Sequence, residues 1–195
     1  PGSGVARSYL GFSHIGTWKD VYKPCNDCNL NTQDLFEPFQ IEWEPGSNQI
    51  GDFSWCGYSI IVLKNVKDYM DQKRVKVSWG NVNVLKPTST VRKKMVSYPY
   101  TGPDLYWLTS VEKINLDSEQ SGLEIKTKCN TCGRIRYKFI MEGIVISKST
   151  WSNQHIFKIK QFGLSAATFI TEEMLNGLKS KGFNNLWYKE AGIIK

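Results

Sequence analysis

The chain lacks the short motifs by which many nucleotide-binding and hydrolytic enzymes are recognised. It has no glycine-rich phosphate loop, no Gly-x-Ser-x-Gly and no His-Glu-x-x-His. Its two histidines, His14 and His155, leave little scope for a Ser-His-Asp arrangement, and the acid pair Glu172 and Glu173 is better explained as a solvated face. The sequence therefore offers no catalytic residue, and we expect a protein that is not an enzyme.

Long hydrophobic runs are also missing. The longest largely apolar run, residues 58–63, is far shorter than the roughly 20 residues that span a bilayer. No apolar stretch near the N-terminus resembles a secretory signal. We therefore expect no membrane partner and a cytoplasmic location. Residues 1–4 read Pro-Gly-Ser-Gly, which is typical of a cloning remnant, so they are left out of the predicted domain.

The composition predicts one folded domain with an ordinary core. Hydrophobic residues make up 41% and aromatic residues 13% of the 195 residues. We expect a single α+β domain over residues 5–195. Lys and Arg outnumber Asp and Glu by 25 to 18, and the resulting net charge of +7 favours an anionic partner. The basic residues are scattered in short groups at 73–74, 92–94 and 134–138, so a solvated basic surface is the simpler interpretation.

Four of the five cysteines form two Cys-x-x-Cys pairs, Cys25–Cys28 and Cys129–Cys132. Each turn can direct two thiolates at one metal ion, and two turns complete the four-sulfur tetrahedral shell that zinc prefers. Strands expected on either side of the second pair place it at the tip of a hairpin. We therefore predict a zinc-ribbon-like module from residues 18–31 and 122–141, with structural Zn²⁺ bound by Cys25, Cys28, Cys129 and Cys132.

The cysteine spacing leaves two alternatives open. A Cys-x-x-Cys pair can be a redox dithiol, although neither pair opens a plausible helix. Two separate disulfides are the other alternative, but nothing in the sequence points to secretion. Because 100 residues separate Cys28 from Cys129, tertiary structure must close a metal site. The fifth cysteine, Cys56, stands among aromatic residues and is expected to be a small buried hydrophobe.

Hydrophobic periodicity predicts a mixed or antiparallel sheet with a few helices. Apolar residues at near-helical spacing predict a helix over residues 59–73. Alternating apolar and polar residues predict a strand over 75–79, which residues 82–85 extend past a turn at Gly80–Asn81. A further strand is expected over 105–116.

The C-terminal part predicts a strand, a helix and a second strand. Residues 165–170 resemble a strand, and Thr171 is a good N-cap for a helix over 172–181. Gly182 is expected to end this helix in the left-handed conformation. A closing strand is predicted over 186–190.

Several of these features occur in one order along the chain. After the first Cys-x-x-Cys pair come Gly51–Trp55, Cys129–Arg134, His155–Phe157 and the strand-helix-strand ending. From about residue 18 to 190 the chain resembles the double-CxxCG motif family of bacterial proteins. Asn29 stands where the first motif of that family has glycine. The resemblance implies that the four cysteines are zinc ligands, and that the chain is an immunity protein encoded beside a polymorphic toxin.

An immunity protein of this kind would bind a cognate toxin tightly and stoichiometrically. The charge of +7 suits a toxin surface that is acidic or neutral. Aromatic side chains dominate binding hot spots, so the candidate contacts are Tyr98, Tyr100, Tyr106 and Trp107. The alternative interpretation, that these aromatics are core residues, stays open.

The alternative function is a zinc-ribbon nucleic-acid-binding protein. Basic and aromatic residues alternate over 134–139, and such a pattern can stack on single-stranded nucleic acid. A half-buried strand beside a zinc site shows the same alternation. Nucleic acid is therefore the less favoured partner.

Overall fold

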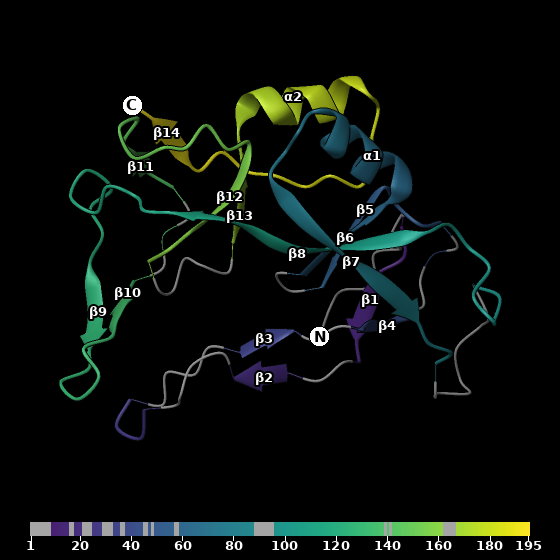
Figure 1. The fold of residues 1–195 in the computed structure, drawn as a ribbon, viewed down its shortest axis with the longest axis horizontal. Helices are drawn as coiled ribbons and strands as arrows, with labels where there is room; N and C mark the ends of the chain where they lie inside the picture. The colour runs from purple at the N-terminus through teal and green to yellow at the C-terminus, as the bar shows by residue number, and fades with distance from the viewer. Residues whose placement is uncertain are drawn as a thin grey trace.

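The protein is described by a computed structural model, shown in Figure 1. The structure describes residues 9–15, 18–20, 25–28, 33–35, 38–44, 47, 49–56, 59–87, 96–138, 140, 142–161 and 167–195. Its elements are, in chain order, β1 Phe12–His14, β2 Trp18–Asp20, β3 Gln33–Leu35, β4 Phe39–Trp43, β5 Phe53–Cys56, β6 Ser59–Leu63, α1 Lys64–Gln72, β7 Val77–Val84, β8 Leu105–Ile114, β9 Ile125–Lys128, β10 Ile135–Tyr137, β11 Ile144–Ile146, β12 Ile156–Ile159, β13 Thr168–Ile170, α2 Glu172–Ser180 and β14 Gly192–Ile194.

The ten-residue strand β8 organises the main sheet (Figure 1). It pairs antiparallel with β6 and β7, and parallel with β12 through its last residues. The β4–β7 pair is also parallel, whereas the β1–β4, β5–β6 and β12–β13 pairs are antiparallel. The eight strands follow the order β1-β4-β7-β8-β12-β13, with β6 joining β5 to β8. The mixed sheet and the two helices confirm the predicted α+β class.

Buried side chains form three clusters. The helix cluster packs both helices onto the sheet and comprises Phe53, Val62, Val66, Tyr69, Met70, Val75, Val111, Ile156, Met174 and Leu178. The aromatic cluster comprises Leu10, Phe12, Phe39, Ile41, Trp43, Ile61, Leu105 and Trp107. The third cluster comprises Ile114, Leu116, Ile144, Ile146, Phe157 and Ile159. The core thus extends along the whole length of β8.

The helix predicted over residues 59–73 is wrong in its first part. Residues 59–63 form strand β6, and α1 begins only at Lys64. Ile61 is buried in the aromatic cluster and Val62 in the helix cluster, so the strand is covered on both faces. A strand buried in this way gives a continuous apolar run, which periodicity cannot separate from a buried helix. Pairing with β5 and β8 makes residues 59–63 a strand and not part of the helix.

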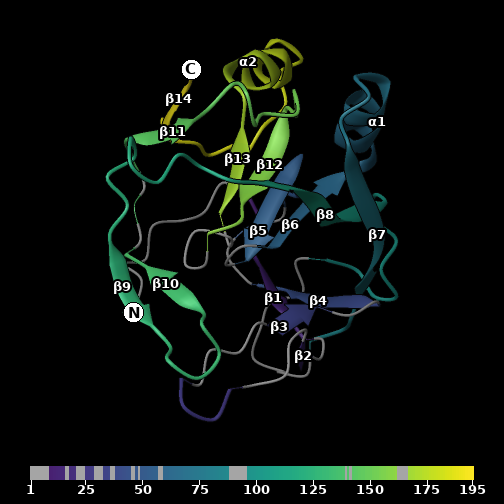
Figure 2. The ribbon, with the colours of Figure 1, turned by 60° about the vertical axis from the view of Figure 1, so that its left-hand side comes forward.

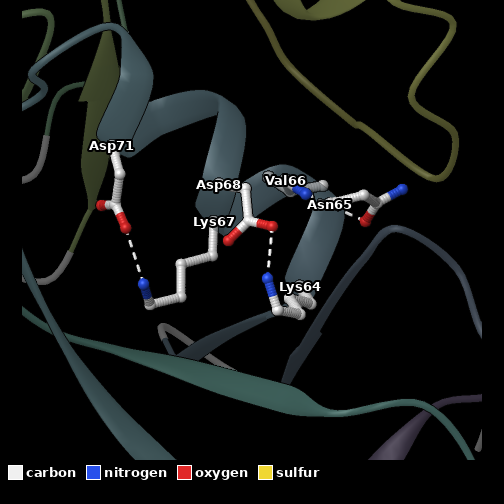
Figure 3. A network of polar contacts seen from close by, with 6 residues as sticks. All are labelled: Lys64, Asn65, Val66, Lys67, Asp68 and Asp71. Atoms are coloured by element: carbon white, nitrogen blue, oxygen red, sulfur yellow. Dashed lines mark hydrogen bonds and ion pairs between the residues drawn. The ribbon is translucent and has the colours of Figure 1, made fainter.

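Helix α1 separates its apolar and charged side chains. Val66, Tyr69 and Met70 are buried. Two ion pairs one turn apart, Lys64–Asp68 and Lys67–Asp71, lie along the helix (Figure 3). The first is exposed, whereas Lys67 lies over the Tyr106 ring of β8. Ion pairs between neighbouring turns add little to stability, so packing of the buried face holds the helix in place.

Strand β7 runs without interruption through Gly80 and Asn81. These residues pair with Trp107 and Tyr106 of β8, so the turn predicted there is wrong. Cross-strand pairing has overridden the local turn preference of the glycine-asparagine sequence. The strand predicted over 105–116 is confirmed as β8.

The C-terminal helix begins and ends as predicted. The Thr171 hydroxyl accepts a hydrogen bond from the Met174 backbone N–H at 3.4 Å, and Gly182 has a φ of +74°. Gly177 gives α2 a close approach to α1, because a Cβ there would lie 2.4 Å from the Tyr69 hydroxyl. The closing strand predicted over 186–190 is wrong. The chain continues to β14, which pairs in parallel with β11.

Two further hairpins lie outside the main sheet. The β9–β10 hairpin stands apart from the body in both views, and the chain around Cys25–Cys28 passes beneath its tip (Figures 1 and 2). The strands β2 and β3 form a second antiparallel pair on either side of that chain segment. The strands predicted beside the second cysteine pair are therefore confirmed, and an additional hairpin holds the first pair.

Candidate metal centre

Each Cys-x-x-Cys pair lies at the turn of its own hairpin. Cys25–Cys28 lies between β2 and β3, and Cys129–Cys132 lies between β9 and β10. The two turns face each other, although Cys25 and Cys129 are 104 positions apart in the sequence. The structure thus brings together all four cysteines that the sequence predicts as metal ligands.

The four sulfur atoms have the spacing of a tetrahedral site. All lie within 4.8 Å of one another. Across the two turns, the Cys25 and Cys129 sulfurs are 3.8 Å apart and the Cys28 and Cys132 sulfurs 3.7 Å apart. A tetrahedral ion with metal–sulfur bonds of about 2.3 Å separates its sulfurs by roughly 3.8 Å. A disulfide bond is about 2.0 Å long, and the four thiols are free.

The backbone of the second turn prepares one of the thiols for metal binding. Gly133 has a φ of +71°, which lets the chain reverse direction. The Cys129 N–H donates to the Arg134 carbonyl and the Gly133 N–H donates to the Cys129 carbonyl, both at 2.9 Å. The Cys132 backbone N–H, directed at the Cys129 sulfur, is the main cause that lowers the pKa of this thiol to about 6. Because the thiolate is the form that binds metal, the turn favours ligation near neutral pH.

The two turns also contact each other through their middle residues. The Thr131 hydroxyl donates a hydrogen bond to the Asp27 carboxylate, and both side chains are exposed. Cys129 is buried, Cys25 and Cys28 are half-buried and Cys132 is exposed. Four sulfur ligands fill a tetrahedral shell and leave no position for a reacting water. The arrangement can therefore hold a metal ion that joins two hairpins.

The predicted partner contacts do not form one exposed surface. Trp107 is 6% exposed and stacks on Phe39 with ring centroids 4.5 Å apart, so it is a core residue. Tyr98, Tyr100 and Tyr106 are half-buried. Burial, with a smaller effect of Asp104, raises the pKa of Tyr100 to about 12. Contact of the three tyrosines with a partner stays a prediction. Cys56 lies in β5, and its side chain is outside the part of the chain that the structure describes.

The segment Gly51–Trp55 has a structural role that its sequence does not reveal. The buried Asp52 carboxylate accepts hydrogen bonds from the Asn65 side chain at 2.8 Å and from the Asn184 backbone N–H at 2.9 Å. The Asn184 side chain in turn accepts from the Asp52 N–H at 3.0 Å. A Cβ on Gly51 would lie 2.6 Å from the Asn185 Cβ. The segment therefore fastens the chain after α2 to β5 and α1.

Two exposed aromatic residues were assigned to a strand by the sequence pattern. Trp187 is 69% exposed and Tyr188 46% exposed, and neither belongs to a strand. The Lys179 ammonium lies 4.3 Å from the centre of the Tyr188 ring. Their clustering with charged residues near the end of the chain is the signal that would have identified them as surface residues.

The fold and the cysteine cluster together define an α+β protein with a four-thiol centre able to hold a metal ion. A comparison with protein families matches residues 91–192, just over half of the chain, to the immunity protein family (Imm11). The chain therefore belongs to this immunity protein family. Comparisons with curated proteins and with solved structures give no match.

The match confirms the predicted class of bacterial immunity protein. The matched residues include Cys129 and Cys132 but not the first cysteine pair, so the match does not bear on the double-CxxCG motif. Among the described residues, neither helix has the length and apolar character needed to cross a membrane.

Proposed function

We propose that this chain neutralises a cognate protein toxin by stoichiometric binding, and that its four-cysteine centre holds structural zinc. The observation that carries the proposal is the match of residues 91–192 to an immunity protein family. An immunity protein acts by occupying or covering the toxin, so we propose no enzymatic activity for the chain itself.

The ligand set supports zinc as the metal. Soft thiolate ligands select zinc, copper(I) or iron–sulfur clusters, and a tetrahedral set of four sulfurs is typical of zinc or an iron–sulfur site. Sulfur separations of 3.7 and 3.8 Å fit a single ion. Free thiols persist in a reducing compartment, which is why we place the protein in the bacterial cytoplasm.

In this proposal the metal supports binding through structure alone. Zinc would join the β2–β3 hairpin to the β9–β10 hairpin, which makes few other connections to the sheet. A surface that is rigid before binding loses less conformational entropy in the complex. The centre would therefore strengthen toxin binding without contacting the toxin's reacting atoms.

Capture from the native bacterium, followed by a protection assay, tests the proposal. The chain is used as bait at about physiological salt, and bound proteins are identified by mass spectrometry. We expect a stoichiometric partner encoded next to the gene of this chain. That partner should stop growth when it is produced alone in a test bacterium, and production of this chain should restore growth. A neighbouring gene product that neither binds nor is toxic would contradict the proposal.

Nucleic-acid binding is the second candidate function. The observation in its favour is the alternation of basic residues with Ile135 and Tyr137 over 134–138, directly after the second cysteine pair. This function predicts binding to DNA or RNA that weakens steeply as salt is raised. Nucleic acid as the only captured partner, lost on nuclease treatment, would favour it over the immunity function.

A further inference from the structure

The positive charge of the protein is concentrated on the β9–β10 hairpin. Residues 122–138 contain five cations and one carboxylate, Glu124, which gives a net charge of +4 out of +7 for the whole chain. The cations are Lys126, Lys128, Arg134, Arg136 and Lys138. The sequence pattern of scattered basic groups conceals this concentration, because β9 and β10 bring cations on both sides of the cysteine turn together.

The hairpin presents these charges to solvent. All four residues of β9 are exposed. On β10 the exposed Arg136 lies between the half-buried Ile135 and Tyr137. Ile125, at the start of β9, is 55% exposed and is one of the few large apolar side chains on the surface of the described residues. The hairpin surface therefore combines several cations with an apolar side chain.

Three of these five cations have no ion-pair partner among the residues that the structure describes. Lys138 forms an ion pair with Glu124. Lys126, Lys128 and Arg136 form no ion pair with the residues that the structure describes. By contrast, two lysines of α1 are each paired with an aspartate one turn away. Three exposed cations are thus free to interact with an external anionic group.

We propose that the exposed surface of the β9–β10 hairpin binds an acidic surface of the cognate toxin. This inference rests on the proposed function and names the part of the chain that contacts the toxin. Lys126 and Lys128 on one face of the hairpin, and Arg136 on the other, attract and orient acidic side chains of the toxin. Ile125 shares the face of Arg136, which pairs with Thr127, and makes apolar contact with the toxin there. The metal centre fixes the hairpin, so this surface is ordered before the toxin arrives.

The composition of the hairpin favours a protein partner over nucleic acid. Single-stranded nucleic acid is bound by exposed aromatic side chains on which bases stack, and β9 has no aromatic residue. Tyr137 on β10 is half-buried. Protein interfaces combine an apolar centre with a polar rim and are enriched in arginine. Complementary charge also accelerates association between proteins.

The test compares two triple variants of equal charge. One replaces Lys126, Lys128 and Arg136 by serine. The matched control replaces three exposed lysines outside the hairpin that also lack an ion pair among the described residues, Lys76, Lys86 and Lys160. The probe is the purified product of the neighbouring toxin gene, inactivated at its active site. Association and dissociation rates are measured at about 0.05 M and 1 M salt.

We expect the hairpin variant to associate roughly 10-fold more slowly than wild type at low salt, because electrostatic steering changes association rates by 10-fold or more. At 1 M salt, where the Debye length is about 3 Å, the difference should nearly vanish. The control variant should stay within about 2-fold of wild type, since it lacks only distant charges. An Ile125→Ser variant should mainly speed dissociation. Equal metal content and melting temperature for all variants show that folding is unchanged.

Several outcomes would overturn the inference. Equal association rates for the hairpin and control variants would mean that the toxin binds elsewhere, while toxin binding by wild type would leave the immunity function intact. Failure of the toxin to bind wild type would overturn both. Single-stranded DNA and RNA of 20 nucleotides serve as a further probe. Wild type and the control variant could bind these probes in a salt-dependent way while the hairpin variant does not. If toxin binding is also the same for all three proteins, the hairpin surface binds nucleic acid.

Discussion

The main sheet buries large side chains on both faces, whereas the β9–β10 hairpin exposes every residue of its first strand. Ile61 and Val62 point into two different core clusters from adjacent positions of β6. In the hairpin segment 124–138, by contrast, the buried residue is Cys129. The two regions therefore depend on different stabilising interactions within one chain.

This contrast indicates where a bound metal ion would add most to stability. Burial of a Leu, Ile or Phe side chain stabilises a fold by about 1.5–3 kcal/mol, and the three clusters supply many such side chains. An isolated two-stranded hairpin is marginal in water. Structural zinc in finger peptides is worth roughly 10–16 kcal/mol. A metal ion can thus order the hairpins, where burial of side chains cannot. Variants of the metal centre and variants of the packed sheet and helices should therefore behave differently.

The largest expected effect is loss of the metal. Cys129→Ser removes one of four sulfurs and should reduce the zinc content from about one ion per chain to near zero, because the remaining ligands no longer complete the tetrahedral shell. Hydrogen exchange should then become fast over residues 125–138 and stay slow in β8. Metal analysis and exchange mass spectrometry measure both.

Cys56→Ser is the matched control for metal loss, since Cys56 lies in β5 and belongs to neither Cys-x-x-Cys pair. Its zinc content should equal that of wild type. If purified wild type carries no metal, and Cys129→Ser exchanges and melts as wild type does, the four-cysteine centre has no role in holding metal.

A core substitution should lower the stability of the fold without releasing the metal. Leu178 is fully buried in the helix cluster, so Leu178→Ala should cost about 2–5 kcal/mol in the free energy of unfolding. Zinc content should stay the same. Leu175 is only half-buried on the same helix, and Leu175→Ala should cost less. Chemical denaturation gives both values, and equal losses would contradict the burial difference.

Breaking the hydrogen bonds of Asp52 should have an intermediate effect. Asp52→Asn leaves one oxygen for two donors, the Asn65 side chain and the Asn184 N–H. The expected loss of stability is about 1–3 kcal/mol, the penalty for an unsatisfied buried group. The control is Asp68→Asn, which breaks only an exposed ion pair and should cost about 0.5 kcal/mol or less. If both variants unfold alike, the Asp52 contacts do not fasten the C-terminal segment.

The smallest expected effect is at the start of α2. Thr171→Ala removes the hydroxyl that accepts from the Met174 N–H and should cost about 1 kcal/mol. The same hydroxyl lies 3.0 Å from the His155 ring nitrogen. Thr171→Ser keeps the hydroxyl and should stay close to wild type. Thermal unfolding of the two variants separates loss of the cap from loss of the methyl group.

Local signals identified the elements that depend on local chemistry. Thr171 and Gly182 mark the ends of α2, since capping is a property of neighbouring residues. The paired cysteines identified the four-thiol cluster, because ligand type and two-residue spacing can be read directly from the sequence. Two features were not predicted: strand β6, which is covered on both faces, and the continuation of β7 through Gly80 and Asn81. Pairing with β8 determines the conformation of both segments.

Residues whose role depends on distant contacts could not be assigned from sequence. Asp52 reaches Asn184 across 132 positions, and nothing local marks the carboxylate as buried. Trp107 is among the predicted partner contacts although it lies in a predicted strand, and its burial follows from pairing with two other strands and stacking on Phe39. The basic surface of the β9–β10 hairpin also required the fold, which places Lys126 and Arg136 on neighbouring strands.

The separation of the two cysteine pairs has a consequence for synthesis on the ribosome. The chain grows by about 5–20 residues per second, and Cys129 follows Cys25 by 104 positions. The first two thiols are therefore made about 5 to 20 seconds before their partners. During that interval they are open to oxidants and to other metal ions. On the proposed zinc assignment, zinc supply and redox balance during translation would help to determine how much correctly loaded protein a cell obtains.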